Sequence, residues 1–162
     1  MKPSDLLRLL DEFFREKAAL RNRHMATARV VGEYDLNNAC QYFIAREEQH
    51  LAWVGDAIRQ MGGTADDMPA VPSLPPAKTV EAQRNLLTED AQGLEEFDGR
   101  WRGRIRGLAN ARVQLLLELI LGEVLEQARA YRQAATGRLD VLGRRTGGER
   151  TEGQVLSTRW VE

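Results

Sequence analysis

Apolar residues recur at steps of three and four along most of the chain, the spacing of helices with one buried face. The first stripe follows the helix-start signal Pro3-Ser4, and Gly32 breaks it. The Gly62-Gly63 pair ends the second stripe, and the cap-like Asn110 opens the last. The pattern predicts four helices, over residues 4–31, 36–62, 80–105 and 110–136.

The connections between these helices predict how they are arranged. Short turns at Gly32 and Gly107 make each pair an antiparallel hairpin. Residues 62–78 contain four prolines, which resist helix formation. Extended at roughly 3.3 Å per residue, this segment spans over ~50 Å, more than the ~38 Å length of each predicted helix. We therefore expect an all-α four-helix bundle of two hairpins joined by a long crossover over residues 1–137, and a C-terminal tail with some strand character over 138–162.

The composition of the chain excludes several classes of protein. The formal net charge is -1, so no positive field exists to hold nucleic acid or an anionic membrane. Every apolar run is far too short for a membrane span, and the N-terminal segment fits neither a secretory nor a transit peptide. Cys40 is the single cysteine, which excludes an internal disulfide and a cysteine-based metal cage. These features predict a soluble, cytoplasmic protein whose metal ligands, if any, are carboxylates and imidazole.

Acidic residues interrupt the apolar stripes at one level of the predicted bundle. Glu47 and His50 lie one turn apart on the inner face of the second helix. Glu123 and Glu126 are spaced in the same way on the fourth helix, in a similar polar and apolar pattern, and Asp90 lies on the inner stripe of the third. So many carboxylates repel one another or retain protons unless a cation neutralises them. A divalent metal ion would remove this cost.

This arrangement resembles the ferritin-like superfamily, in its bacterioferritin and rubrerythrin branch, over roughly residues 4–136. The resemblance implies a two-iron carboxylate site in which Glu47 bridges or chelates, His50 is a terminal ligand, Asp90 is the acid of the third helix and Glu123 is the second bridging acid. Glu126 stands where the family has its second histidine, which makes the site richer in carboxylate and suits manganese or ferrous iron.

The first helix departs from the family pattern. The position that should hold its acid is Phe14, with Glu12 and Glu16 on either side. Glu16 keeps the phase of the apolar stripe, so we choose it as the sixth ligand. Lys17 also lies on the inner stripe, and an inward ammonium group would neutralise the core acids and replace the metal.

Two functions follow from these alternatives. In the first, the protein holds two iron ions, with manganese as the other metal, and performs oxidase, ferroxidase or peroxide chemistry with dioxygen or peroxide. In the second, it is a metal-free bundle that serves as a structural or protein-interaction module. The first function requires Glu16 to face the core and Lys17 to face solvent, and the second requires the reverse.

The remaining features give weaker predictions. The basic and aromatic run Arg100–Arg106 is interpreted as a solvated helix end rather than a nucleic-acid contact. Cys40 is interpreted as a small buried hydrophobic residue. His24 has no assigned role. The tail carries Val155, Leu156, Trp160 and Val161, too much apolar surface to leave in water. We expect it to cover outer helix positions such as Trp53 and Leu117, and we expect a homodimer held partly by Trp160.

Overall fold

The computed structural model describes residues 2–66, 68–138 and 141, and these form four α-helices without a β-strand among them. The helices are α1 (Pro3–Val30), α2 (Tyr34–Gln60), α3 (Val80–Arg106) and α4 (Ala111–Ala135). The predicted all-α, four-helix class is therefore confirmed. The predicted strand character of the tail, and its apolar residues 155–161, fall outside the described residues.

Local sequence signals account for where the helices begin and end. α1 has proline at its start, where a missing N–H costs nothing. The side chains of Glu33, Thr79 and Asn110 cap α2, α3 and α4 by accepting hydrogen bonds from backbone N–H groups of the first turns. α2 ends before Gly62, whose positive φ of 83 degrees lies in the left-handed region that glycine adopts without strain.

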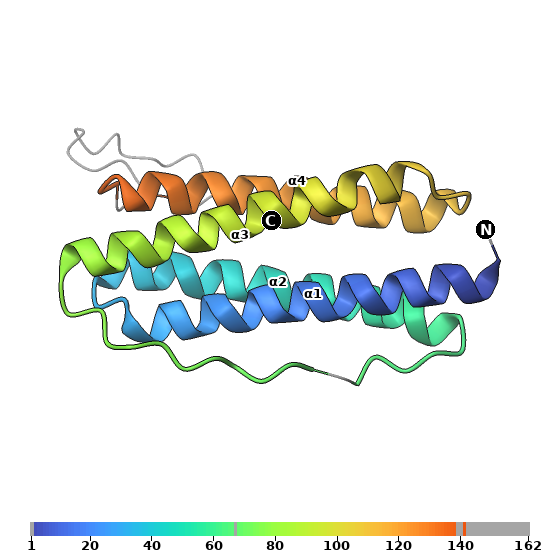
Figure 1. Ribbon diagram of the computed structural model, residues 1–162, viewed down its shortest axis with the longest axis horizontal. Coiled ribbons are helices and arrows are strands. Elements are labelled where there is room, and N and C mark those ends of the chain that lie inside the picture. Colours follow the sequence, from blue (N-terminus) through green and yellow to red (C-terminus); the bar gives the residue numbers. More distant parts are fainter. Residues whose placement is uncertain (1, 67, 139–140, 142–162) are drawn as a thin grey trace, which may run out of the picture.

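The helices pack in pairs, and the pairs then pack together (Figure 1). Three residues, 31–33, join α1 to α2, and four, 107–110, join α3 to α4; each pair lies side by side. α1 also packs on α3, whereas α2 and α4 touch only sparsely. Residues 61–66 and 68–79 run along the outside of the molecule between the end of α2 and the start of α3. Asn22 of α1 donates a hydrogen bond to the Pro69 carbonyl in this segment.

The apolar stripes meet in one core. Phe13, Phe97 and Trp101 are fully buried at its centre, with ring centroids 5.0–6.2 Å apart in tilted and edge-on contacts. Leu117 is also fully buried, so its expected role as an outer-face receiver of the tail is wrong. The reason is its helical phase, since it lies on the same face of α4 as Ile120, Leu121 and Val124.

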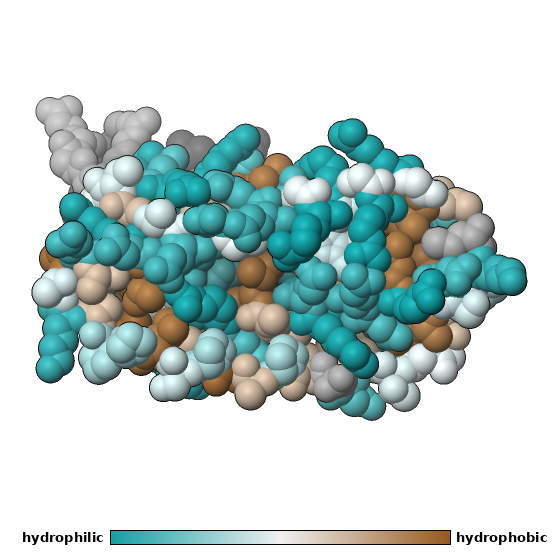
Figure 2. All heavy atoms as spheres, viewed as in Figure 1, coloured by the Kyte–Doolittle hydropathy of each residue, from teal (hydrophilic) through white to brown (hydrophobic). Residues whose placement is uncertain are grey.

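One face of the molecule shows how polar side chains cover the helices. Figure 2 shows a mostly hydrophilic face, with apolar side chains appearing in the gaps between elements. None of the four described helices is both long enough and apolar enough to span a bilayer. Against this polar surface, the large apolar side chains that are exposed, which include Leu115 and Leu119 of α4, are candidate contact positions.

Candidate functional site

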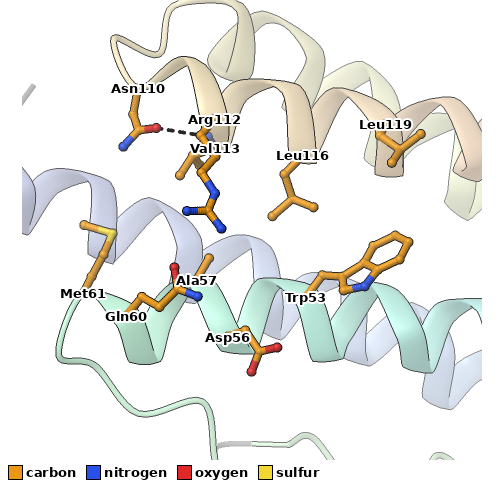
Figure 3. A pocket seen from close by; sticks show the side chains of 10 residues that line it. All are labelled: Trp53, Asp56, Ala57, Gln60, Met61, Asn110, Arg112, Val113, Leu116 and Leu119. Atoms are coloured by element: carbon orange, nitrogen blue, oxygen red, sulfur yellow. Dashed lines mark hydrogen bonds between the residues drawn. The ribbon is translucent and has the colours of Figure 1, made fainter.

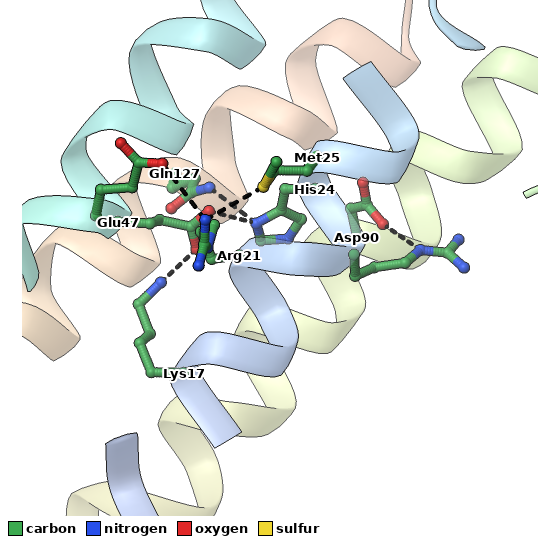
Figure 4. A network of polar contacts seen from close by, with 9 residues as sticks. Lys17, Arg21, His24, Met25, Glu47, Asp90 and Gln127 are labelled. Atoms are coloured by element: carbon green, nitrogen blue, oxygen red, sulfur yellow. Dashed lines mark hydrogen bonds and ion pairs between the residues drawn. The ribbon is translucent and has the colours of Figure 1, made fainter. Parts of the chain in front are cut away.

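A buried ion pair links α1 and α2 inside the bundle (Figure 4). The Lys17 ammonium group donates a hydrogen bond to Oε1 of Glu47, and both side chains have no exposed surface. His24 Nδ1 lies 2.8 Å from Oε2 of the same carboxylate and is also fully buried. The side chain of Gln127, from α4, reaches within 3.3 Å of that nitrogen. Both oxygens of Glu47 are thus occupied by protein donors.

These contacts keep Glu47 ionised. Burial alone would raise the pKa of Glu47, because it penalises the charged carboxylate. The charges and hydrogen bonds of His24 and Lys17 outweigh burial and lower the pKa to about 2. Glu47 therefore carries a full negative charge at neutral pH, and the Nδ1–H group of His24 donates to it.

A second polar cluster bridges α2 and α4. His50 Nε2 lies 2.8 Å from Oε2 of Glu123, and Arg46 binds both oxygens of that carboxylate at 2.6–3.1 Å. Burial opposes ionisation of Glu123, but the hydrogen bonds from Arg46 and His50 lower its pKa. Burial and the Lys17 charge lower the pKa of His50, so the neutral imidazole donates its Nε2–H to Glu123.

The other predicted ligands lie apart from these two clusters. The buried Asp90 accepts a hydrogen bond from Arg23 Nε at 2.9 Å. Glu126 is 70% exposed and pairs with Arg129 one turn further along α4. Asp90 thus has the inward position that its stripe predicted, whereas Glu126 points to solvent.

The acids of α1 face α3 instead of the core. Glu16 accepts hydrogen bonds from the indole N–H of Trp101 at 3.0 Å and from Arg100 at 3.1 Å, and Glu12 forms a two-point ion pair with Arg104. Two arginines of the basic run of α3, Arg100 and Arg104, therefore pair with the acids of α1. Arg102 pairs with Asp98 within α3. Lys17, and not Glu16, occupies the inner stripe.

The arrangement of donors does not fit a dinuclear metal centre. The carboxylates of Glu47, Glu123 and Asp90 are each paired with a lysine or arginine, which supplies the positive charge that a metal ion would supply. Within residues 2–66, 68–138 and 141, no group of three or more His, Cys, Asp or Glu side chains is placed to hold a metal ion. Metal binding itself stays a prediction.

Sequence reasoning missed three partners of the predicted acids, namely His24, Arg23 and Arg46. His24 gave one usable signal, because it lies two helical turns after Lys17 and so on the same face of α1. The sequence offered no comparable signal for Arg46. It directly precedes Glu47, at a position that the helical pattern predicts to face solvent, and its partner Glu123 is 77 residues away.

Comparisons with protein families, with curated proteins and with solved structures found no match for this chain. The resemblance to the ferritin-like superfamily therefore rests on the motifs of this sequence alone, and no family is assigned to the chain.

Proposed function

We propose that this protein is a ferritin-like bundle, with two antiparallel hairpins and a crossover, whose polar core is neutralised by ion pairs and which works as a protein-interaction module in the cytoplasm. The observation that carries the proposal is the buried ion pair between Lys17 and Glu47. A protonated lysine at this point cancels the charge of the central carboxylate, so the core needs no metal ion for charge balance.

The second observation is where the apolar surface lies. Redox chemistry on a dinuclear centre needs a dry cavity beside open metal positions. Among the described residues, two cavities lie between α2 and α4, and both open at the surface. One groove between α2 and α4 has a volume of about 510 Å³ and is lined by Trp53, Met61 and Leu116 among others. A surface groove with apolar walls is typical of a binding face.

Metal analysis tests the proposal against the dinuclear alternative. We expect full-length protein, incubated with ferrous iron or manganese in air-free buffer and then desalted, to retain well below one ion per chain. Retention of about two ions per chain, with loss in His50→Ala, would establish the metal site instead. The Asp56→Asn variant is the control, because its carboxylate is exposed and is not among the predicted ligands.

One observation favours the dinuclear alternative as the second candidate. Two buried atoms of predicted ligands, Asp90 Oδ2 and His50 Nδ1, have no hydrogen-bond partner among the described residues. Buried polar atoms are normally hydrogen-bonded. Asp90 Oδ2 and His50 Nδ1 can therefore each accept a further bond from a water molecule or bind an ion. The metal analysis distinguishes these occupants.

A further inference from the structure

We propose that the occupant of the α2–α4 face is a second copy of this chain, and that the two copies of α4 lie antiparallel about a two-fold axis near Leu119. This inference rests on the proposed function, because it supplies the partner of the interaction module. The shape, the charge and the size of the face support it.

The shape of the face combines a ridge with a groove. Leu115 and Leu119, one turn apart on α4, are 67% and 53% exposed. Leu119 also lines the 510 Å³ groove, where Trp53 of α2 lies across from Leu116 of α4 (Figure 3). Met61, which directly follows α2, lines the groove as well. The groove exists because α2 and α4 pack only sparsely against each other. One copy therefore presents both an apolar ridge and an apolar recess, which a symmetric pair requires.

One pair of positions on the open surface of α4 is complementary about Leu119. Leu116 lies three positions before it and Gly122 three positions after it, so an antiparallel second copy places each Leu116 over a Gly122. A Cβ atom added at Gly122 would meet nothing within 4 Å, so the surface there is open to a side chain from outside. The two copies of Leu119 meet at the axis itself.

Two charged residues of α4 are placed symmetrically on either side of Leu119. Arg112 lies seven positions before Leu119 and Glu126 seven positions after it, so the antiparallel pairing brings Arg112 opposite Glu126 of the second copy at both ends. Arg112 lines the groove and forms no ion pair with any residue that the structure describes. Glu126 is 70% exposed, and its contact is with Arg129 of the same helix. Opposite charges at both ends select this register over a parallel one.

The size of the face suits a stable dimer. α4 runs over 25 residues. At about 1.5 Å per residue, such a helix is roughly 38 Å long. Two neighbouring helices, each about 10 Å across, then offer roughly 750 Å² per chain. Specific interfaces bury about 800 Å² per partner, so the α2–α4 face alone comes close to the required area.

Sedimentation equilibrium of the full-length chain between about 1 and 100 µM tests the inference. We expect a dimer, and we expect Leu119→Glu to raise the dissociation constant at least 100-fold, because two carboxylates then meet at the axis without a partner. Val80→Glu is the control, because Val80 is an exposed apolar residue on α3 (66%, against 53% for Leu119) whose replacement should leave the dimer intact. A monomer at 100 µM, or a dimer that Leu119→Glu does not weaken, would overturn the proposal.

Charge reversal tests the register. Arg112→Glu and Glu126→Arg should each weaken the dimer about tenfold, because each single change places like charges opposite one another, and the double variant should restore wild-type affinity. Failure of the double variant to recover would overturn the antiparallel pairing. Metal content tests the proposed function and molar mass tests this inference, so either can fail while the other stands. Circular dichroism of each variant is measured alongside, and we expect each variant to remain helical.

Discussion

Replacing Lys17 with methionine is expected to lower the free energy of unfolding by about 3 kcal/mol at pH 7. Breaking a buried ion pair by removing one partner typically costs about 3–5 kcal/mol, because the remaining charge stays buried without compensation. The lower end applies here, since His24 still contacts the Glu47 carboxylate at 2.8 Å. Methionine matches the length of the lysine stem, so the change removes charge with little loss of packing. Urea denaturation monitored by circular dichroism measures the difference.

The double variant Lys17→Met, Glu47→Gln separates charge from packing. Glutamine keeps a side-chain oxygen for the His24 contact but carries no charge, so we expect stability within about 1.5 kcal/mol of the wild type. Methionine replacement at the exposed Arg8 serves as the control for the substitution itself. A loss below about 1 kcal/mol in Lys17→Met would show that the ammonium group does not hold the core acid, and the proposed function would lose its supporting observation.

The bounds of the four helices were largely predictable, because the residues that begin and end each helix lie in its own sequence. Proline at the start of α1, Asn110 before α4 and glycines at the ends of α2 and α4 all lie where the structure has helix boundaries. Apolar periodicity likewise identified most of the buried residues of α3, including Phe97 and Trp101, although Val80, the first residue of the predicted stripe, is exposed. These signals act within one helix, so no knowledge of the neighbouring helices is needed to interpret them.

The polar core was predictable in part, through the turn that precedes α2. Lys17 and Glu47 lie equally far along the chain on either side of Gly32, so a hairpin that turns there brings them to the same level. Glu47, His50 and Asp90 are buried as their stripes predicted. The choice between Glu16 and Lys17 as the inward residue was decided by α3, whose Arg100 and Trp101 bind Glu16 at the surface.

The pairing of charges between hairpins could not be predicted. Arg46 and Glu123 are 77 residues apart, and their contact depends on how far α2 and α4 separate. Such separations follow from the volumes of all the side chains between the helices, which no local pattern specifies. The excess of inward acids was therefore visible in the sequence, while the identity of the cations that balance them was not.

The stability of the protein is expected to fall by about 3 kcal/mol as the pH is lowered from about 4.5 to about 2. The pKa of Glu47 is about 2 in the folded protein, against an ordinary value of 4.5, because His24 and Lys17 outweigh the effect of burial. Between these values the unfolded chain binds the proton and the folded chain does not, so acid favours unfolding. A difference of about 2.5 in pKa corresponds to about 3 kcal/mol at about 1.4 kcal/mol for each unit of pH. Urea titrations at stepped pH measure it.

The double variant Lys17→Met, Glu47→Gln isolates the contribution of Glu47, because residue 47 no longer titrates in it. The stability of this variant should therefore depend less on pH below 4.5.

His50 also makes the protein less stable as the pH falls, but at higher pH. Burial lowers the pKa of His50 below 6.5, so the unfolded chain takes up the proton first. Carboxylates crowded together without cations behave in the opposite way, because protonation relieves their repulsion and stability then rises as the pH falls from 7 to 5. A rise over that range in metal-free protein would contradict the ion-paired core and restore the case for a metal ion at its centre.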